Sequence, residues 1–266
     1  MTRRRWGMRR TRWERFRRVW AITGTTVGVI FIGWSVLAYR ASGGAYAALE
    51  TTETVTVSSR DGYWRFEPRV SADVGLLFFP GALVDPVAYA PLVKAVAERG
   101  YTVVLIQVPR RGAMGGAESA ELAARYMRAM RETDTSGEPR RWIVAGHSRG
   151  GVISSNVVRS LREGVAGLVL VGTSHPRDFS LAHLPIPVTQ VFGTRDTVAD
   201  LHKVEAARRN LPPSLHTVRI DGGNHSQFGS YGFQPGDWPA TITREEQQRL
   251  TVEAIVAALA RAAASR

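Results

Sequence analysis

The sequence predicts a doubly wound α/β fold, in which helices cover both faces of a mostly parallel sheet. From Val74 onward, short apolar runs alternate with helix-like segments, the pattern of parallel strands buried on both faces. Before this point, residues 54–58 and 63–66 flank Asp61-Gly62, which predicts a hairpin of two antiparallel strands. An antiparallel pair followed by strand–helix alternation indicates one sheet within one large domain, which we place at residues 51–266.

Each element of this fold is expected from a local pattern. Asp85 and Pro86 have the residue types of a helix cap and first turn, and Thr243 with Glu246 forms a capping-box pattern before the last helix. Further strands are expected at residues 74–79, 102–108, 141–145, 167–171, 187–192 and 215–220, and helices at residues 86–99, 118–131, 152–163, 198–210 and 243–264.

The positive charge of the chain is concentrated at its start. Nine arginines precede residue 19 against a single acid, Glu14, and account for +8 of the formal net charge of +12. The remainder is only mildly basic, so the charge does not indicate a nucleic-acid-binding face. We therefore interpret residues 1–18 as a basic cytoplasmic tail.

Residues 19–39 are predicted to cross a membrane. These twenty-one residues carry no charge, which is enough for a helix to span the hydrocarbon core. Trp20, Trp34 and Tyr39 lie towards the ends, where amphipathic rings favour the interface. The basic tail places the N-terminus inside, so this single-pass protein would hold its domain outside the cytoplasm, after a linker at residues 40–50.

Residues 19–39 also allow two other interpretations. A cleavable signal peptide would end near Ala45-Tyr46-Ala47, giving a secreted protein, but its apolar region is usually shorter, so a retained signal anchor is favoured. The third interpretation, a helix buried inside the domain, is disfavoured by the arginines that flank the segment.

The chain has no cysteine, which excludes disulfides and a thiol nucleophile. Metal-ligand spacings are also absent, and we expect neither a metal nor another cofactor.

Ser148 is the predicted nucleophile. It lies in a G-x-S-x-G pattern, Gly146-His-Ser-Arg-Gly150, between an apolar strand and a helix-like segment. A serine on such a tight strand-to-helix turn exposes its hydroxyl, and Gly146 and Gly150 give the turn the space it requires. The following helix directs its N-terminal N–H groups at any anion that forms there.

A serine hydroxyl needs a base and an orienting acid. Asp196 follows the expected strand 187–192, and His225 follows the strand 215–220 through Asp221-Gly-Gly-Asn224. Both would lie at the C-terminal edge of the sheet. Asp200 is the weaker candidate for the acid. His175 is the competitor for the base, whereas His147 is interpreted as structural.

An oxyanion hole is expected from two backbone N–H groups. Arg149 supplies one directly after the nucleophile, and Ala82 supplies the other in the loop after strand 74–79, where Gly81 allows the turn. The alternative for this loop is a simple Pro-Gly turn.

These motifs together resemble the α/β-hydrolase superfamily, in particular its compact bacterial branch related to dienelactone hydrolases. The resemblance covers about residues 54–264, with serine in place of the dienelactone hydrolases' cysteine and Pro80-Gly81 in place of the commoner His-Gly. It implies an α/β-hydrolase fold, a Ser148–His225–Asp196 triad, and Ala82 and Arg149 as oxyanion donors. The residues that carry it are Phe79-Pro-Gly-Ala82, Asp85-Pro-Val-Ala-Tyr-Ala-Pro-Leu92, Gly146-His-Ser-Arg-Gly-Gly151, Gly193-Thr-Arg-Asp196 and Gly222-Gly-Asn-His-Ser-Gln-Phe228.

The expected activity is that of an anchored carboxylesterase acting on a small-molecule or lipid-like acyl ester. Residues 172–185 leave no room for a cap domain in the connection where the superfamily inserts one. A serine peptidase or amidase on the same fold, and a non-catalytic binding module, are the alternatives. Arg149 and Arg195 flank the nucleophile and the acid; they are either contacts for an anionic substrate group or, as we favour at this point, solvated side chains.

Overall fold

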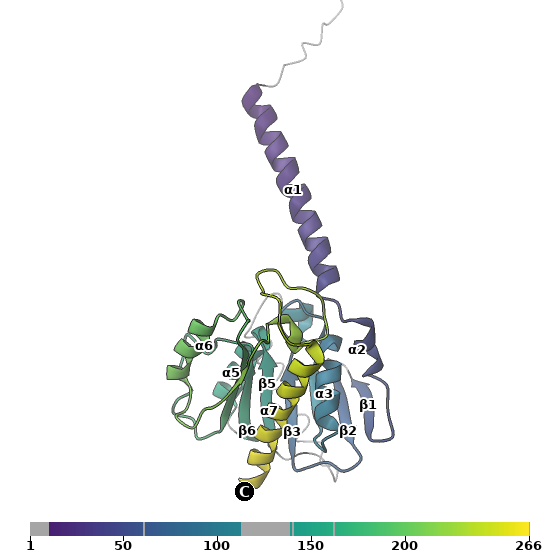
Figure 1. Cartoon of the computed structure of the whole chain (residues 1–266), viewed down its shortest axis with the longest axis vertical. Coiled ribbons are helices and arrows are strands. Elements are labelled where there is room, and N and C mark those ends of the chain that lie inside the picture. The colour runs from purple at the N-terminus through teal and green to yellow at the C-terminus, as the bar shows by residue number, and fades with distance from the viewer. Residues whose placement is uncertain (1–10, 61, 113–138, 140, 162, 266) are drawn as a thin grey trace, which may run out of the picture. The chain divides into compact units, whose positions relative to one another are not determined.

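The computed structural model describes residues 11–60, 62–112, 139, 141–161 and 163–265 of the chain (Figure 1). The chain divides into two compact units, Met1–Ala38 and Tyr39–Arg266. The first contains one helix, α1 (Arg12–Ala38), in which no residue is buried. By length and composition α1 is able to cross a membrane, with a mean hydropathy of 1.7, and the same properties fit an N-terminal signal sequence.

The second unit is built on a single eight-stranded sheet in the order β1-β2-β4-β3-β5-β6-β7-β8. Strand β2 runs antiparallel to β1 and β4, and every other pair is parallel. The predicted hairpin and the mostly parallel sheet are therefore both confirmed. The strands are β1 (Val55–Arg60), β2 (Tyr63–Pro68), β3 (Val74–Phe79), β4 (Val103–Ile106), β5 (Arg141–His147), β6 (Val165–Val171), β7 (Val188–Gly193) and β8 (His216–Ile220).

Helices cover both faces of this sheet, as Figure 1 shows for α3, α5 and α7. Along β3, Leu76 and Phe78 face one hydrophobic core, which α3 and α7 complete, and Leu77 and Phe79 face the other, which α5 completes. This two-sided burial explains why β3 and β4 have no polar side chain. The helices are α2 (Gly43–Ala47), α3 (Ala90–Ala97), α5 (Arg149–Ser160), α6 (Leu201–Ala207) and α7 (Arg244–Ala264), with short 3₁₀ turns η1 (Pro86–Tyr89), η2 (Pro109–Gly112), η3 (Arg208–Asn210) and η4 (Ser226–Phe228).

The ends of several helices differ from the sequence prediction. The helix expected from residue 152 begins three residues earlier, at Arg149, because Ser148 itself occupies the N-cap position. The segment predicted from residue 86 begins as the 3₁₀ turn η1, capped by the Asp85 side chain. The capping box is present, since the Thr243 hydroxyl accepts a hydrogen bond from the Glu246 N–H at 3.1 Å. The helix predicted at residues 118–131 lies outside the described residues.

Residues 40–50, expected as a linker, pack against the domain. Helix α2 lies in this segment, and Ala45 is only 1% exposed within the core on the α3 side. The Ser42 N–H donates to the Ser230 carbonyl at 2.8 Å, and the Asp85 N–H donates to the Tyr39 carbonyl at 2.9 Å. These contacts make the chain from Tyr39 onward part of the domain.

Candidate active site

Ser148 lies on a sharp turn between β5 and α5. Its φ of 53° and ψ of −115° are unusual for a residue with a side chain. The turn is possible because glycines surround it: a Cβ on Gly146 would lie 2.2 Å from the Gly150 carbonyl carbon, and one on Gly150 would lie 2.1 Å from the Phe79 oxygen. The strand–turn–helix context that the G-x-S-x-G pattern predicted is therefore present.

Asp196 and His225 form a buried pair at the C-terminal edge of β7 and β8. His225 Nδ1 lies 2.8 Å from Asp196 Oδ2, and both side chains are 1% exposed. The other carboxylate oxygen accepts N–H groups from Val198 at 3.0 Å and Ala199 at 2.7 Å, which fixes the carboxylate plane. An Nδ1–H that donates to Asp196 leaves Nε2 as the basic nitrogen of the ring.

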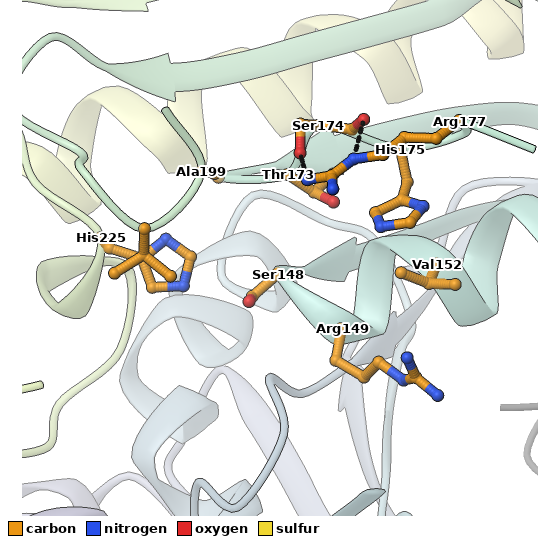
Figure 2. Close-up of a pocket in the computed structure, with 11 residues that line it drawn as sticks. Ser148, Arg149, Val152, Thr173, Ser174, His175, Arg177, Ala199 and His225 are labelled. Carbon is orange, nitrogen blue, oxygen red and sulfur yellow. Dashed lines mark hydrogen bonds between the residues drawn. The ribbon is translucent and has the colours of Figure 1, made fainter. Parts of the chain in front are cut away.

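The serine and the histidine lie on the same cavity. Figure 2 shows the Ser148 oxygen pointing toward the His225 ring, and both residues line a cavity of about 180 Å³. Within the described part of the chain, no hydrogen bond joins these two side chains. Such contacts in unliganded sites often tighten only when substrate binds.

The loop after β3 is held close to the serine by a buried hydrogen-bond chain. The Gly81 N–H donates to the Tyr89 hydroxyl at 3.1 Å, and this oxygen lies 2.7 Å from His147 Nδ1. A Cβ on Gly81 would lie 3.6 Å from Ser148 Cβ, so the loop passes directly beside the nucleophile. Among the described residues, the N–H groups of Ala82 and Arg149 have no hydrogen-bond acceptor, as the predicted oxyanion donors require.

The other candidates for the acid and the base have different contacts or positions. Asp200 caps α6 by accepting the N–H groups of His202 and Lys203, and so does not orient a histidine. His175 lines the cavity, but Figure 2 shows its ring over α5 near Val152 and away from the side to which the Ser148 oxygen points. His147 is fully buried and bound to Tyr89, in agreement with the structural role assigned to it.

Two residues that support the site were not found from the sequence. Asp237, 4% exposed, accepts the backbone N–H groups of His225 at 3.1 Å and Ser226 at 2.9 Å. Burial raises the pKa of Asp237, although these hydrogen bonds oppose the shift. Gln247 binds both the N–H and the carbonyl of Asn224, at 3.0 and 2.6 Å. Neither residue belongs to a local motif, and each is identified only by its proximity to the His225 loop in the folded structure.

Of the two arginines that the sequence singled out, Arg149 lines the cavity. Arg195 donates to the Pro239 carbonyl at 2.6 Å and lies over the Trp238 ring, away from the cavity. Arg177, which was not expected from the sequence, also lines the cavity. Among the described residues, no cluster of three or more His, Cys, Asp or Glu side chains is able to hold a metal ion.

The comparison of the sequence with protein families decides the identification. The model of a family described as the alpha/beta hydrolase family matches residues 75–249. The chain belongs to this family. No curated protein matches the chain.

Solved structures with this fold agree with the family assignment. An alpha-beta serine hydrolase homologue from Coxiella burnetii superposes with a TM-score of 0.54 at 19% identity, covering 79% of this chain and 99% of that one. A ferulic acid esterase from Streptomyces cinnamoneus gives 0.56 at 19% identity, with coverages of 73% and 68%. An alpha/beta hydrolase enzyme from the metagenome of lagoon sediments of Mar Chica, Morocco, gives 0.54 at 17% identity, with coverages of 74% and 96%. At these identities the similarity shows the α/β-hydrolase fold.

Proposed function

We propose that this α/β hydrolase is a membrane-anchored serine carboxylesterase. The observation that carries the proposal is the buried His225–Asp196 pair, with an Nδ1–Oδ2 distance of 2.8 Å, on the cavity that the Ser148 hydroxyl enters. A carboxylate that fixes the imidazole and a strained serine beside it are the parts of an acyl-transfer site. Similarity to a serine hydrolase homologue and to a ferulic acid esterase is consistent with this chemistry.

The chemistry follows from these positions. Ser148 Oγ attacks the ester carbonyl carbon while His225 Nε2 accepts the hydroxyl proton, and Asp196 stabilises the resulting imidazolium. The N–H groups of Ala82 and Arg149 bind the oxyanion. His225 then gives its proton to the leaving alcohol, which produces an acyl-enzyme. Water, activated by His225 in the same way, releases the carboxylic acid and restores Ser148.

An ester is favoured over a peptide by the openness of the site. The connection between β6 and β7, residues 172–187, contains no helix and no cap over the cavity. An alkoxide leaves more readily than an amine, so an ester places a smaller demand on acid catalysis by His225. Peptidase or amidase activity and a purely binding role are the alternatives that the experiments below separate.

The retained anchor is supported by the packing of residues 39–47. Cleavage after Ala47 would remove Ala45 from the core and would break the Tyr39–Asp85 and Ser42–Ser230 hydrogen bonds. A signal peptide that is discarded has no reason to contribute core residues to the mature domain. We therefore propose a protein held in the membrane by α1, with a cytoplasmic N-terminus and an extracytoplasmic hydrolase domain.

The test is covalent labelling with a fluorophosphonate, which reacts with activated serines. We expect intact-mass analysis to show one adduct on the full chain and none on Ser148→Ala. The same substitution should lower kcat/KM for a short-chain ester by about 10⁴-fold or more, because the nucleophile is lost while the oxyanion donors remain. Absence of an adduct on folded protein contradicts the proposal and favours a binding role, whereas an adduct with amide but no ester turnover favours the amidase.

A further inference from the structure

The lining of the cavity beside Ser148 includes two arginines, which lie on different sides of the serine in Figure 2. Arg149 and Arg177 line it together with the neutral side chains Thr173, Ser174 and Val152. Among the described residues, no Asp or Glu side chain lines this cavity. An ester that enters the site therefore meets positive charge a short distance from the nucleophile.

Arg177 is held in place by the buried residue Ser174. The Arg177 Nε–H donates to the Ser174 carbonyl at 3.2 Å, and Nη2 contacts the Ser174 hydroxyl. Ser174 is 2% exposed, so this anchor belongs to the rigid C-terminal edge of the sheet. Figure 2 shows the guanidinium folded back toward Thr173, although Arg177 as a whole is exposed. A guanidinium fixed along one edge keeps its other N–H groups for the oxygens of a carboxylate or phosphate.

The charge of these arginines reaches the interior of the cavity. Burial lowers the pKa of His175, and the positive charges of Arg177 and Arg149 lower it further. Asp178 opposes them, but its side chain is exposed and does not line the cavity. His175 therefore favours its neutral form, and the positive potential of the two arginines extends to its ring.

We propose that this site selects esters that carry a carboxylate or phosphate within a few bonds of the scissile carbonyl, with the anion bound by Arg177. The inference rests on the proposed esterase function and names its substrate class. Arg177 lines the same cavity as Ser148, so an anion bound by the guanidinium lies within a few bonds of the ester carbonyl that Ser148 attacks. The positive field of Arg149 adds to the attraction without a direct contact.

The test uses two pairs of esters that differ only by a carboxylate in place of a methyl group. Monomethyl succinate and methyl butyrate differ on the acyl side, and 2-carboxyethyl acetate and propyl acetate differ on the alcohol side. With the full chain in a neutral detergent, we expect kcat/KM for the charged ester to exceed that for its neutral partner about tenfold or more in at least one pair. The pair that shows the preference identifies the side of the ester that carries the anion.

Variants assign the preference to Arg177. Arg177→Gln should lower the ratio of kcat/KM for the charged ester to that for the neutral ester about tenfold. Arg177→Lys keeps the positive charge but not the planar guanidinium with its paired N–H groups, and should give an intermediate ratio. The matched control is Arg159→Gln, which removes the same charge from α5 at a side chain that lies over the Phe179 ring and does not line the cavity. The control should keep the parent ratio.

The possible outcomes separate the two proposals. A ratio of one or below in both pairs, or an unchanged ratio in Arg177→Gln, overturns the inference even if Ser148 is labelled and neutral esters are hydrolysed. Absence of both labelling and hydrolysis overturns the esterase proposal, and the substrate class with it.

Discussion

His147 and His225 lie side by side, with ring centroids 4.4 Å apart, but their partners differ. His225 binds the carboxylate of Asp196, whereas His147 binds the Tyr89 hydroxyl. Complete burial places the pKa of His147 well below its ordinary value, and the neighbouring His225 lowers it further. His147 therefore favours its neutral form, and a second positive charge beside the His225 ring is disfavoured.

This burial has a consequence for stability against pH. The folded state binds the His147 proton more weakly than the unfolded state, so the free energy of unfolding falls as pH drops below about 6.5. The loss attributable to this residue should reach up to about 1.4 kcal/mol per pH unit below about pH 6 and vanish above about pH 7.5. Urea unfolding of residues 39–266 between pH 5 and 8 measures it.

The control for this prediction is His147→Asn, whose amide is placed to bind Tyr89 as Nδ1 does but has no proton to take up. Its unfolding free energy should depend less steeply on pH than that of the parent. Part of the slope should remain, because the pKa of His175 is also lowered by burial. An identical slope in the two proteins would show that His147 is not the group responsible.

At the level of elements, the segment before the sheet connects to both loops of the site. The Tyr39 carbonyl accepts from Asp85, which follows the loop that carries Ala82, and its ring lies 6.0 Å from that of Tyr231. Ala41 forms an isolated bridge with Tyr231 in the loop after His225. Residues 39–47 thus stabilise the loops on two sides of the cavity.

Removal of this segment should destabilise the domain. A protein that begins at Ala48 loses two backbone hydrogen bonds and the packing of Ala45 and Tyr39, about 3 kcal/mol relative to one that begins at Tyr39. For a domain of this size we expect the Tm to fall by roughly 5–10 °C. A protein that begins at Ser42 should fall in between, because it retains α2. Equal Tm values for all three would mean that the segment is dispensable.

At the scale of the whole molecule, the positive charge of the N-terminal arginines and the apolar helix α1 together form the basis of the membrane prediction. Nine arginines precede residue 19, and the uncharged stretch of α1 follows them directly. The proposed topology, with the arginines on the cytoplasmic side of a bilayer, rests on this arrangement.

The membrane prediction is tested by fractionation. The full chain should sediment with membranes and resist extraction at alkaline pH, whereas a protein that lacks residues 1–38 should be soluble. Protease added from outside the cytoplasmic membrane should digest the domain. Recovery of a soluble form with the intact mass of a chain beginning near residue 48 would instead establish cleavage of a signal peptide.

Local patterns were sufficient for much of this molecule. The G-x-S-x-G turn, the order Ser148, Asp196, His225, and the apolar strands each depend on neighbours in the chain, because a turn or a two-sided strand restricts the residues within it. The order of motifs along a parallel sheet then places Asp196 and His225 at the same edge, where the structure finds their hydrogen bond.

Contacts between distant segments required the tertiary structure. Asp237 holds His225 from twelve residues away, Tyr89 connects Gly81 to His147, and Arg177 rather than Arg195 reaches the cavity. Their roles depend on which loops meet above the sheet and on the direction of each side chain. Sequence periodicity does not predict these contacts, because a buried polar group is satisfied by any partner that the fold brings within about 3 Å of it. The sequence by itself determined the chemistry of the site; the packing of its loops decided which residues hold that chemistry in place and what charge surrounds it.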